Sequence, residues 1–297
     1  MLTQAGIDRG FSLTTFVDGF VPVQTPGGLI GPFGVDYQAD GTILVSTESG
    51  NIQRFQNVDG QSAGNVPVLA NHGFANAVGL AHVGSSIYMT QQLNNRVIQL
   101  NSNGTFNRAV ATGLSFATGI AANPLTGHLY VSTNASGGRI VDVDPVAGTF
   151  TTIANANADG LSLSGDSSIL FAALSNNHLV GYSVATGIPV FDSGVIANVG
   201  GIDGSAVGYG EFDGSVFVNA RGGFVVEVDL ATMTQTIIAS GGSRGDFVAA
   251  DPSQNGDLLL TQSDRILRLT GVPEPATLSM LAVAGAVILR RRRRAQA

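Results

Sequence analysis

The segment Gly31-Pro-Phe-Gly-Val-Asp-Tyr-Gln-Ala-Asp-Gly-Thr-Ile-Leu-Val-Ser46 sets a pattern that the rest of the chain repeats. It holds two apolar runs separated by a turn signal, which is typical of a β-hairpin. Five later segments follow the same plan and begin Ala77-Val-Gly-Leu, Ala117-Thr-Gly-Ile, Ala158-Asp-Gly-Leu, Ile202-Asp-Gly-Ser and Gly245-Asp-Phe-Val. The repeated glycines, Gly34, Gly79, Gly119, Gly160 and Gly204, are spaced 45, 40, 41 and 44 residues apart, and Asp246 stands at the equivalent place 42 residues further on.

A period of 40–45 residues with four short strands per unit is the signature of a β-propeller. In the first unit, the strands are expected near 33–37, 42–46, 51–55 and 66–70. No segment before residue 276 shows a convincing helical period. The sequence therefore predicts an all-β fold, a six-bladed propeller with four-stranded antiparallel blades. The alternative is a β-sandwich with chance spacing.

The sixth unit ends near Arg268-Leu-Thr270 with only three expected strands. The run Phe11-Ser-Leu-Thr-Thr-Phe-Val-Asp-Gly-Phe20 resembles the fourth strands of other units. We expect this N-terminal strand to complete blade six, because pairing the two ends of the chain hides sheet edges that would promote aggregation. Residues 1–270 are thus expected to form one domain.

The composition excludes several classes of protein. Of the 297 residues, 44% are hydrophobic and only 12% are charged, and the chain has no cysteine, so a disulfide scaffold and a thiolate site are excluded. Residues 1–270 carry 9 arginines against 20 acidic residues, a net charge of −11. That charge argues against a nucleic-acid partner.

In a propeller, the loops that enter each blade share one face with the loops between second and third strands. This face, called the funnel face below, is where a ligand is expected to bind. The candidate binding residues on it are polar and rich in amides, which suits a neutral polar ligand: Glu48, His72, Gln91, Asn134, Asn176, Asp203, Asn219, Arg221, Asp246 and Gln262, with Asp159 and Arg244 beside them. The alternative is that these residues only form turns.

After Thr270 the composition changes abruptly. Val272-Pro-Glu-Pro275 precedes an apolar segment, 276–289, and then five arginines, Arg290, Arg291, Arg292, Arg293 and Arg294. As a helix, the 14 apolar residues would span about 21 Å, less than the roughly 30 Å of a bilayer core. The segment could still insert if the arginines snorkel and the bilayer thins, with the C-terminus on the cytoplasmic side. The alternative is a buried C-terminal helix.

This tail, residues 271–297, resembles the PEP-CTERM sorting signal of Gram-negative bacteria, with the motif at Pro273-Glu274-Pro275, an apolar helix and a basic cluster in order. The resemblance implies export, a transient membrane anchor, processing by an exosortase, and a place at the cell surface among exopolysaccharide and biofilm components. Residues 1–9 have neither a basic nor an apolar signal region, so export predicts a start upstream of Met1.

The body resembles six-bladed propellers of the NHL and gluconolactonase families. In the lactonase branch, a glutamate before Gly-Pro begins the metal site, whereas Ile30 precedes Gly31-Pro32 here. Asn134 and Asp203 could correspond to its other ligands, but neither has a matching motif. The histidines lack paired metal spacing; His72 and His178 are expected on loops near the funnel.

We therefore predict no catalytic set, metal or cofactor. The favoured interpretation is an exported structural or binding propeller with a glycan or protein ligand. The alternative is a secreted enzyme, a metal-dependent lactonase or a histidine-based lyase, that would use Glu48, His72 or Asp203 in the funnel.

Overall fold

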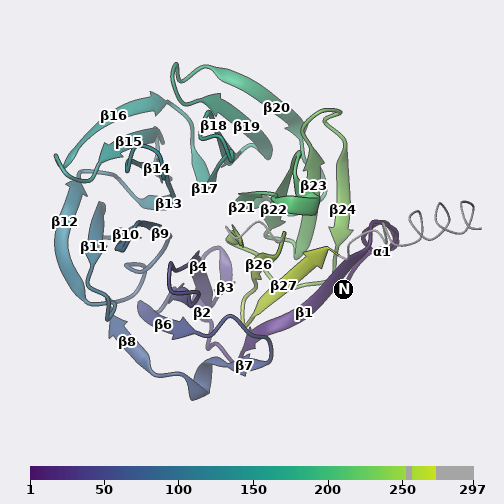
Figure 1. The fold of residues 1–297 in the computed structure, drawn as a ribbon, viewed down its shortest axis with the longest axis horizontal. Coiled ribbons are helices and arrows are strands. Elements are labelled where there is room, and N and C mark those ends of the chain that lie inside the picture. Colours follow the sequence, from purple (N-terminus) through teal and green to yellow (C-terminus); the bar gives the residue numbers. More distant parts are fainter. Residues whose placement is uncertain (252–255, 272–297) are drawn as a thin grey trace, which may run out of the picture.

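The computed structural model describes residues 1–251 and 256–271. Within these residues the chain forms a ring of six antiparallel blades around a central channel (Figure 1). Blade one consists of β4 (Pro32–Tyr37), β5 (Ile43–Thr47), β6 (Asn51–Phe55) and β8 (Val68–Asn71). Blade two consists of β9 (Leu80–Val83), β10 (Ser86–Gln91), β11 (Arg96–Leu100) and β12 (Phe106–Thr112). Blade three consists of β13 (Ala117–Ala122), β14 (Leu129–Thr133), β15 (Ile140–Asp144) and β16 (Thr149–Ala154). Blade four consists of β17 (Ala158–Leu163), β18 (Ile169–Leu174), β19 (His178–Ser183) and β20 (Pro189–Val195). Blade five consists of β21 (Ile202–Val207), β22 (Ser215–Ala220), β23 (Phe224–Asp229) and β24 (Gln235–Ala239).

Blade six joins the two ends of the described chain, as predicted. It consists of β25 (Val248–Ala250), β26 (Leu258–Thr261), β27 (Ile266–Gly271) and the N-terminal strand β1 (Phe11–Asp18). Strand β1 pairs antiparallel with β27, and its last two residues also pair with the short strand β7 (Gln61–Ser62). The last blade is therefore closed on its outer side by the first strand and tied to blade one.

Three features were not predicted. A short helix, α1 (Gln4–Asp8), is capped by the Thr3 hydroxyl. Two 3-10 turns lie at η1 (Ala63–Asn65) and η2 (Gly210–Phe212), and the hairpin β2–β3 (Val23–Thr25, Gly28–Ile30) precedes blade one. No helix among residues 1–251 and 256–271 is long and apolar enough to span a membrane. The predicted apolar helix 276–289, the motif 273–275 and the arginine cluster 290–294 lie outside the described residues.

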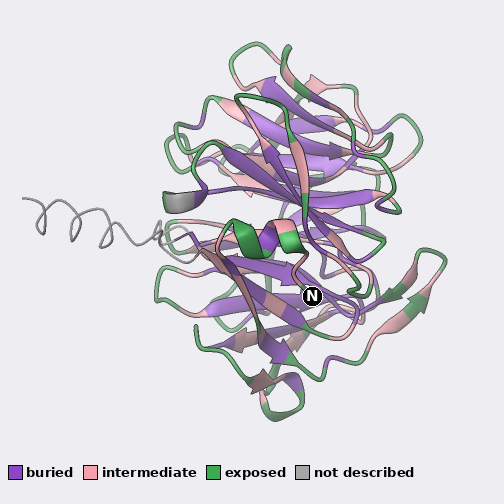
Figure 2. Ribbon diagram, turned by 90° about the vertical axis from the view of Figure 1, so that its right-hand side faces the viewer, coloured by how far each residue is buried: buried purple, intermediate pink, exposed green. Residues whose placement is uncertain are grey.

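The core lies between neighbouring blades. In the edge-on view of Figure 2, buried residues occupy the strands and exposed residues gather at the turns. Apolar side chains of adjacent blades form the clusters; one contains Val97 of blade two together with Val131 and Val141 of blade three. Because neighbouring blades cover both faces of a blade, strands such as β5, β14 and β22 are buried along their whole length.

The repeated glycine allows the innermost strands to approach one another closely. A Cβ atom on Gly34 would lie 2.2 Å from the Val78 carbonyl oxygen, and one on Gly119 would lie 2.1 Å from that of Asp159. Real Cβ atoms do not come this close to a backbone oxygen, so glycine is required at these positions for a steric reason. The carbonyl that each glycine meets belongs to the next blade.

A buried hydroxyl on the second strand bridges the same two blades. Ser132 Oγ accepts the Gly119 N–H at 2.8 Å and donates to the Asp159 carbonyl at 2.7 Å. Ser46 and Thr90 make the same pair of bonds in blades one and two. Each bridge satisfies a buried donor and a buried acceptor at the centre of the ring, where an unpaired group would be costly.

Gly119→Ala tests this steric constraint. The new methyl group must displace the Asp159 backbone, so we expect a loss of at least about 2 kcal/mol in the free energy of unfolding, measured by urea denaturation. Gly165→Ala is the control, because its Cβ would meet only a ring carbon of Tyr209 at 3.6 Å. Equal stability of the two variants would contradict the account.

Candidate functional site

The candidate site is built from the residue that precedes each repeat glycine. These residues lie on the funnel face, where the six innermost strands start. The carbonyls of Val78, Thr118, Asp159, Asp203 and Asp246 each face the glycine of the preceding blade. This corrects the register of the sixth repeat, because Asp246 corresponds to Asp203 and Phe247 occupies the glycine position. The six residues around the axis, called the channel ring below, are Phe33, Val78, Thr118, Asp159, Asp203 and Asp246.

The channel ring is apolar on one side and acidic on the other. Phe33 and Val78 are buried with Ile30 of the hairpin, and the Phe33 and Phe247 rings lie 5.3 Å apart. Asp203 and Asp246 are each only 2% exposed. Three carboxyl groups from consecutive blades therefore converge near the axis, and such a group of buried acids needs compensating positive charge.

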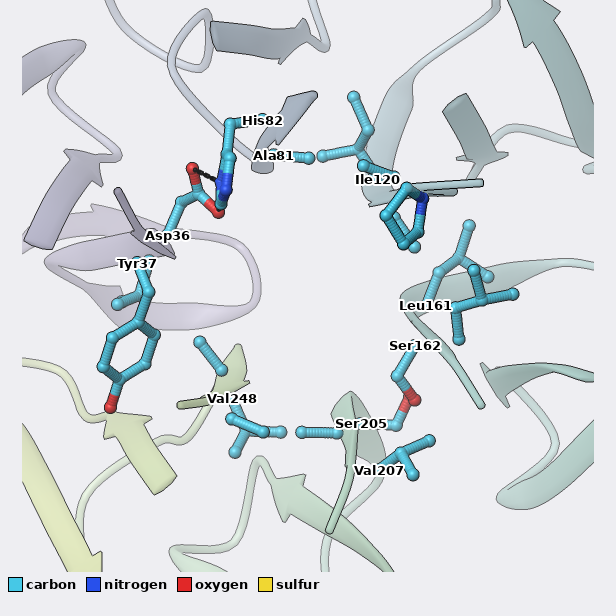
Figure 3. Close-up of a pocket in the computed structure, with 18 of the residues that line it drawn as sticks. Asp36, Tyr37, Ala81, His82, Ile120, Leu161, Ser162, Ser205, Val207 and Val248 are labelled. Atoms are coloured by element: carbon cyan, nitrogen blue, oxygen red, sulfur yellow. Dashed lines mark hydrogen bonds and ion pairs between the residues drawn. The ribbon is translucent and has the colours of Figure 1, made fainter. Parts of the chain in front are cut away.

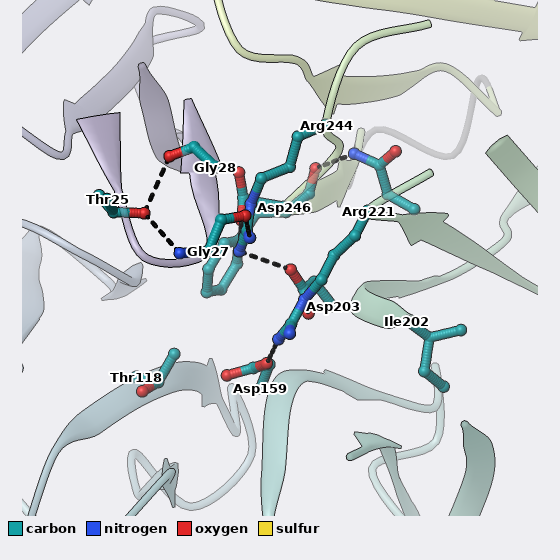
Figure 4. A network of polar contacts seen from close by, with 12 residues as sticks. Thr25, Gly27, Gly28, Thr118, Asp159, Ile202, Asp203, Arg221, Arg244 and Asp246 are labelled. Atoms are coloured by element: carbon teal, nitrogen blue, oxygen red, sulfur yellow. Dashed lines mark hydrogen bonds and ion pairs between the residues drawn. The ribbon is translucent and has the colours of Figure 1, made fainter. Parts of the chain in front are cut away.

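Two arginines from the funnel loops supply that charge (Figure 4). Arg221 follows β22 and donates to Asp203 at 2.6 Å and to Asp159 at 2.7 Å. Arg244 lies on the loop that enters blade six and contacts Asp203 at 2.9 Å and Asp246 at 2.7 Å. Both oxygens of Asp203 thus accept from a guanidinium group, and the arginines close the acidic half of the ring.

The hairpin β2–β3 covers this cluster from the funnel side. Arg244 donates through Nη1 to the Gly27 carbonyl at the hairpin tip. A Cβ on Gly27 would lie 2.6 Å from that same nitrogen, so the tip packs tightly on the guanidinium. The Thr25 hydroxyl orders the turn by accepting from the Gly27 N–H and donating to the Gly28 carbonyl.

Burial dominates the acid–base properties of the cluster. It raises the pKa of Asp203, the carboxylates of Asp159 and Asp246 add to the rise, and the two arginines oppose it. Burial also raises the pKa of Asp246.

Glu48, on the turn after β5, lies next to this cluster. Burial and the Asp246 charge raise the pKa of Glu48 to about 7, against the pull of Arg244. Within the described part of the chain, Glu48 Oε2 and Asp246 Oδ2 are buried without a hydrogen-bond partner. A buried Oε2 without a hydrogen-bond donor agrees with this raised pKa.

The cluster does not fit a divalent cation. Such an ion needs several free oxygen ligands, but the oxygens of Asp203 and one oxygen of Asp246 already accept from guanidinium groups. The positive charges of Arg221 and Arg244 would also repel it. Among residues 1–251 and 256–271, no three His, Asp or Glu side chains are grouped as metal ligands.

The structure brings together only part of the predicted set. Asn134 donates to Asp159 and so joins the cluster. Asn219 donates to the Phe247 and Thr261 carbonyls, and Gln262 accepts from Ser243, so both support the loop that carries Arg244. Arg221, Asp203 and Asp246 form the centre, and Glu48 lies beside them.

The remaining predicted residues lie apart from the cluster. His72 Nε2 contacts the Gly104 carbonyl at 2.8 Å, and Gln91 accepts from Arg96 at 2.6 Å. Asn176 is exposed and accepts from the backbone of His178. His178, expected on a loop, begins strand β19 and contacts Asp192. No predicted histidine reaches the channel ring in the described structure.

Comparisons with known proteins agree with both parts of the sequence. Residues 271–294 match the family model of the PEP-CTERM protein-sorting motif. The chain therefore carries a PEP-CTERM motif at its C-terminus. No curated protein sequence matches the chain.

The body is similar to solved propeller structures. A gluconolactonase from Xanthomonas campestris has a TM-score of 0.71 at 14% identity, covering 91% of this chain and 93% of that one. A virginiamycin B lyase from Staphylococcus aureus has a TM-score of 0.60 at 14% identity, covering 88% and 100%. The calcium-binding protein regucalcin from Agrobacterium tumefaciens has a TM-score of 0.62 at 18% identity, covering 87% and 95%. At these identities, the likeness shows the fold alone.

Glu48→Gln tests the buried acid. Because the folded-state pKa of Glu48, about 7, lies above its ordinary 4.5, the folded protein loses stability as pH rises through this range. The variant lacks that loss. We expect Tm values that match the wild type at pH 4.5 and exceed it by about 2–4 °C at pH 8. Asp18→Asn, at an exposed position, is the matched control; no gain for Glu48→Gln at pH 8 would refute the assignment.

Proposed function

We propose that this protein is exported, sorted by an exosortase-type enzyme, and displayed as a binding propeller at the cell surface or in an exopolysaccharide matrix. The observation that carries the proposal is the PEP-CTERM motif over residues 271–294. The apolar segment 276–289 would hold the protein in the membrane until processing, with the arginine cluster on the cytoplasmic side. Its partners would then be the processing enzyme, the membrane and a matrix ligand.

The closed channel ring supports binding in preference to turnover. An active site needs an accessible acid, base or metal, whereas the three ring aspartates are paired with Arg221 and Arg244 beneath the hairpin. A centre whose acids are bonded to arginines of the same chain suits a scaffold whose outer loops make the contacts.

The funnel loops of blades two and three offer such contacts. Phe74, Leu93 and Phe116, called the apolar patch below, are 47%, 54% and 37% exposed. Hydrogen bonds join their loops, since the Leu93 N–H donates to the Ala75 carbonyl and the Phe116 N–H donates to the side-chain Oδ1 of Asn95. Exposed aromatic rings beside amide side chains fit the C–H faces and hydroxyl groups of a neutral glycan.

Phe116 supports this role through its backbone. Its φ is +55°, a conformation that bulky residues rarely adopt. Its N–H donates to Asn95 at 2.8 Å, and its carbonyl accepts from Asn134 at 3.1 Å, so the strained turn is held from both sides. Residues held in strained backbone conformations cluster at ligand-binding sites, which agrees with a binding role for the patch.

A second candidate function is favoured by Glu48. A buried carboxyl with a pKa near 7 is suited to general acid–base catalysis, and the fold is shared with a gluconolactonase and a lyase. This candidate is a secreted enzyme acting on a lactone or a related ester. Turnover of such a substrate that Glu48→Gln abolishes would favour the enzyme.

Loss of the sorting motif should prevent processing. In the producing bacterium, we expect the wild-type protein at the surface or in the medium, shortened near Pro273-Glu274-Pro275. We expect Glu274→Ala and a deletion of 290–294 to keep the full mass in the membrane fraction, as measured by fractionation and mass spectrometry. Thr270→Ala, just before the motif, is the control. Unchanged processing in a strain without the exosortase would overturn the proposal.

Removing the apolar patch should weaken glycan binding. We expect the double variant Phe74→Ser, Phe116→Ser to sediment with the producer's exopolysaccharide with at least tenfold lower affinity, because each aromatic contact is worth about 1 kcal/mol. Phe106→Ser is the matched control, since Phe106 is 46% exposed on strand β12, away from the patch. If the double variant and the Phe106→Ser control bound the exopolysaccharide equally, the apolar patch would not be the glycan-binding surface.

A further inference from the structure

The central channel holds a cavity at the end opposite the channel ring. It has a volume of about 400 Å³, which is within the range of small-molecule sites. Its walls come from the same inner strands, two to four residues beyond the ring positions, and from turns between first and second strands such as Ser164-Gly165. The cavity therefore opens on the face away from the funnel, and the closed ring separates it from the funnel.

Aliphatic side chains form the middle of the cavity. The residue after the glycine position in five blades is Val35, Leu80, Ile120, Leu161 and Val248, and each lines the cavity. Figure 3 labels three of these side chains, Ile120, Leu161 and Val248, which lie around an open centre. Each is buried but retains 6–7% exposure, so the aliphatic wall faces the cavity and would favour an apolar ligand body.

Polar groups lie on two opposite sides of this wall (Figure 3). On one side, His82 Nδ1 contacts both oxygens of Asp36 at 3.0 Å. This pair leaves Nε2 as the second hydrogen-bonding atom of the ring. On the other side, the hydroxyls of Ser162 and Ser205 lie 3.2 Å apart. The cavity thus offers hydrogen bonds at two ends and apolar contact between them.

The electrostatics favour an uncharged ligand. Among the described residues that line the cavity, only Asp36 and His82 carry formal charges, and these compensate each other when the histidine is protonated. The hydrogen bond that His82 donates to Asp36 raises the pKa of His82 and so favours that state. Because these two charges already compensate each other, a charged ligand group would meet no uncompensated opposite charge here, and burying it would cost more than it gained.

We propose that this cavity binds small, uncharged amphipathic molecules. An aromatic ring or short chain would pack against the aliphatic wall, and hydroxyl or carbonyl groups at its ends would bond to His82 and to the Ser162–Ser205 pair. This site is independent of the funnel face and of the sorting tail, because its residues take part in neither.

A matched pair of probes tests the class of ligand. Tyrosol has an aromatic body with hydroxyls at both ends, and 4-hydroxyphenylacetate has nearly the same shape with a negative charge. We expect the full-length protein to bind tyrosol with a Kd of about 1 mM, and the anion at least tenfold more weakly, measured by ligand-observed NMR and calorimetry. Failure to detect tyrosol binding at 20 mM, or equal binding of the anion, would overturn the proposal.

Variants locate the binding. Val248→Phe and Leu161→Phe each fill the cavity, so both should abolish tyrosol binding. Two filling variants are used so that the test still stands if one of them does not fold. His82→Phe should weaken binding about tenfold. The matched control is His128→Phe, because His128 contacts Asp142 at 2.7 Å in a similar pair but does not line the cavity. Binding that survives both filling variants in folded protein would overturn the proposal.

Discussion

The close approach of neighbouring inner strands is the constraint on which the rest of the structure depends. Each repeat glycine leaves room for the carbonyl of the next blade, and in blades one to three a hydroxyl such as Ser132 holds that carbonyl in place. The strands meet at their funnel ends, so the residue before each glycine is brought to the axis. A packing requirement thus determines which side chains can reach the centre.

The chemistry of the centre follows from what occupies those six places. Phe33 and Val78 extend the apolar core to the axis, whereas Asp203 and Asp246 place buried acids there. Buried acids without cations would destabilise the fold, and the arginines offset part of that penalty while occupying oxygens that a metal would use. The same scaffold could hold a metal in a propeller that has other residues here, which is why fold likeness alone does not transfer an activity.

The sequence was sufficient for the architecture because the repeat is local and periodic. The spacing of the glycines predicted the blades, and the strand Phe11–Asp18 was correctly expected to close blade six. The register of the sixth repeat was wrong by one residue, because Phe247 replaces the glycine that marked the others. The ion pairs were not predicted, since Arg221 reaches Asp159 across 62 positions and no sequence period links them. The turn Thr25-Pro26-Gly27-Gly28 is a signal that could have indicated the hairpin.

The two ends of the channel differ for one reason. At the funnel end the strands converge on charged residues, and the charges have to be neutralised by parts of the same chain, which closes the space. Two to four residues further along, the strands carry aliphatic side chains with few charges to compensate, and the space between them stays open. A ligand at the open end would need little reorganisation of the protein, whereas one at the funnel centre would first have to displace Arg244 from the hairpin and from two buried carboxyl groups. Binding on the funnel face is therefore expected at its outer loops and not at its centre.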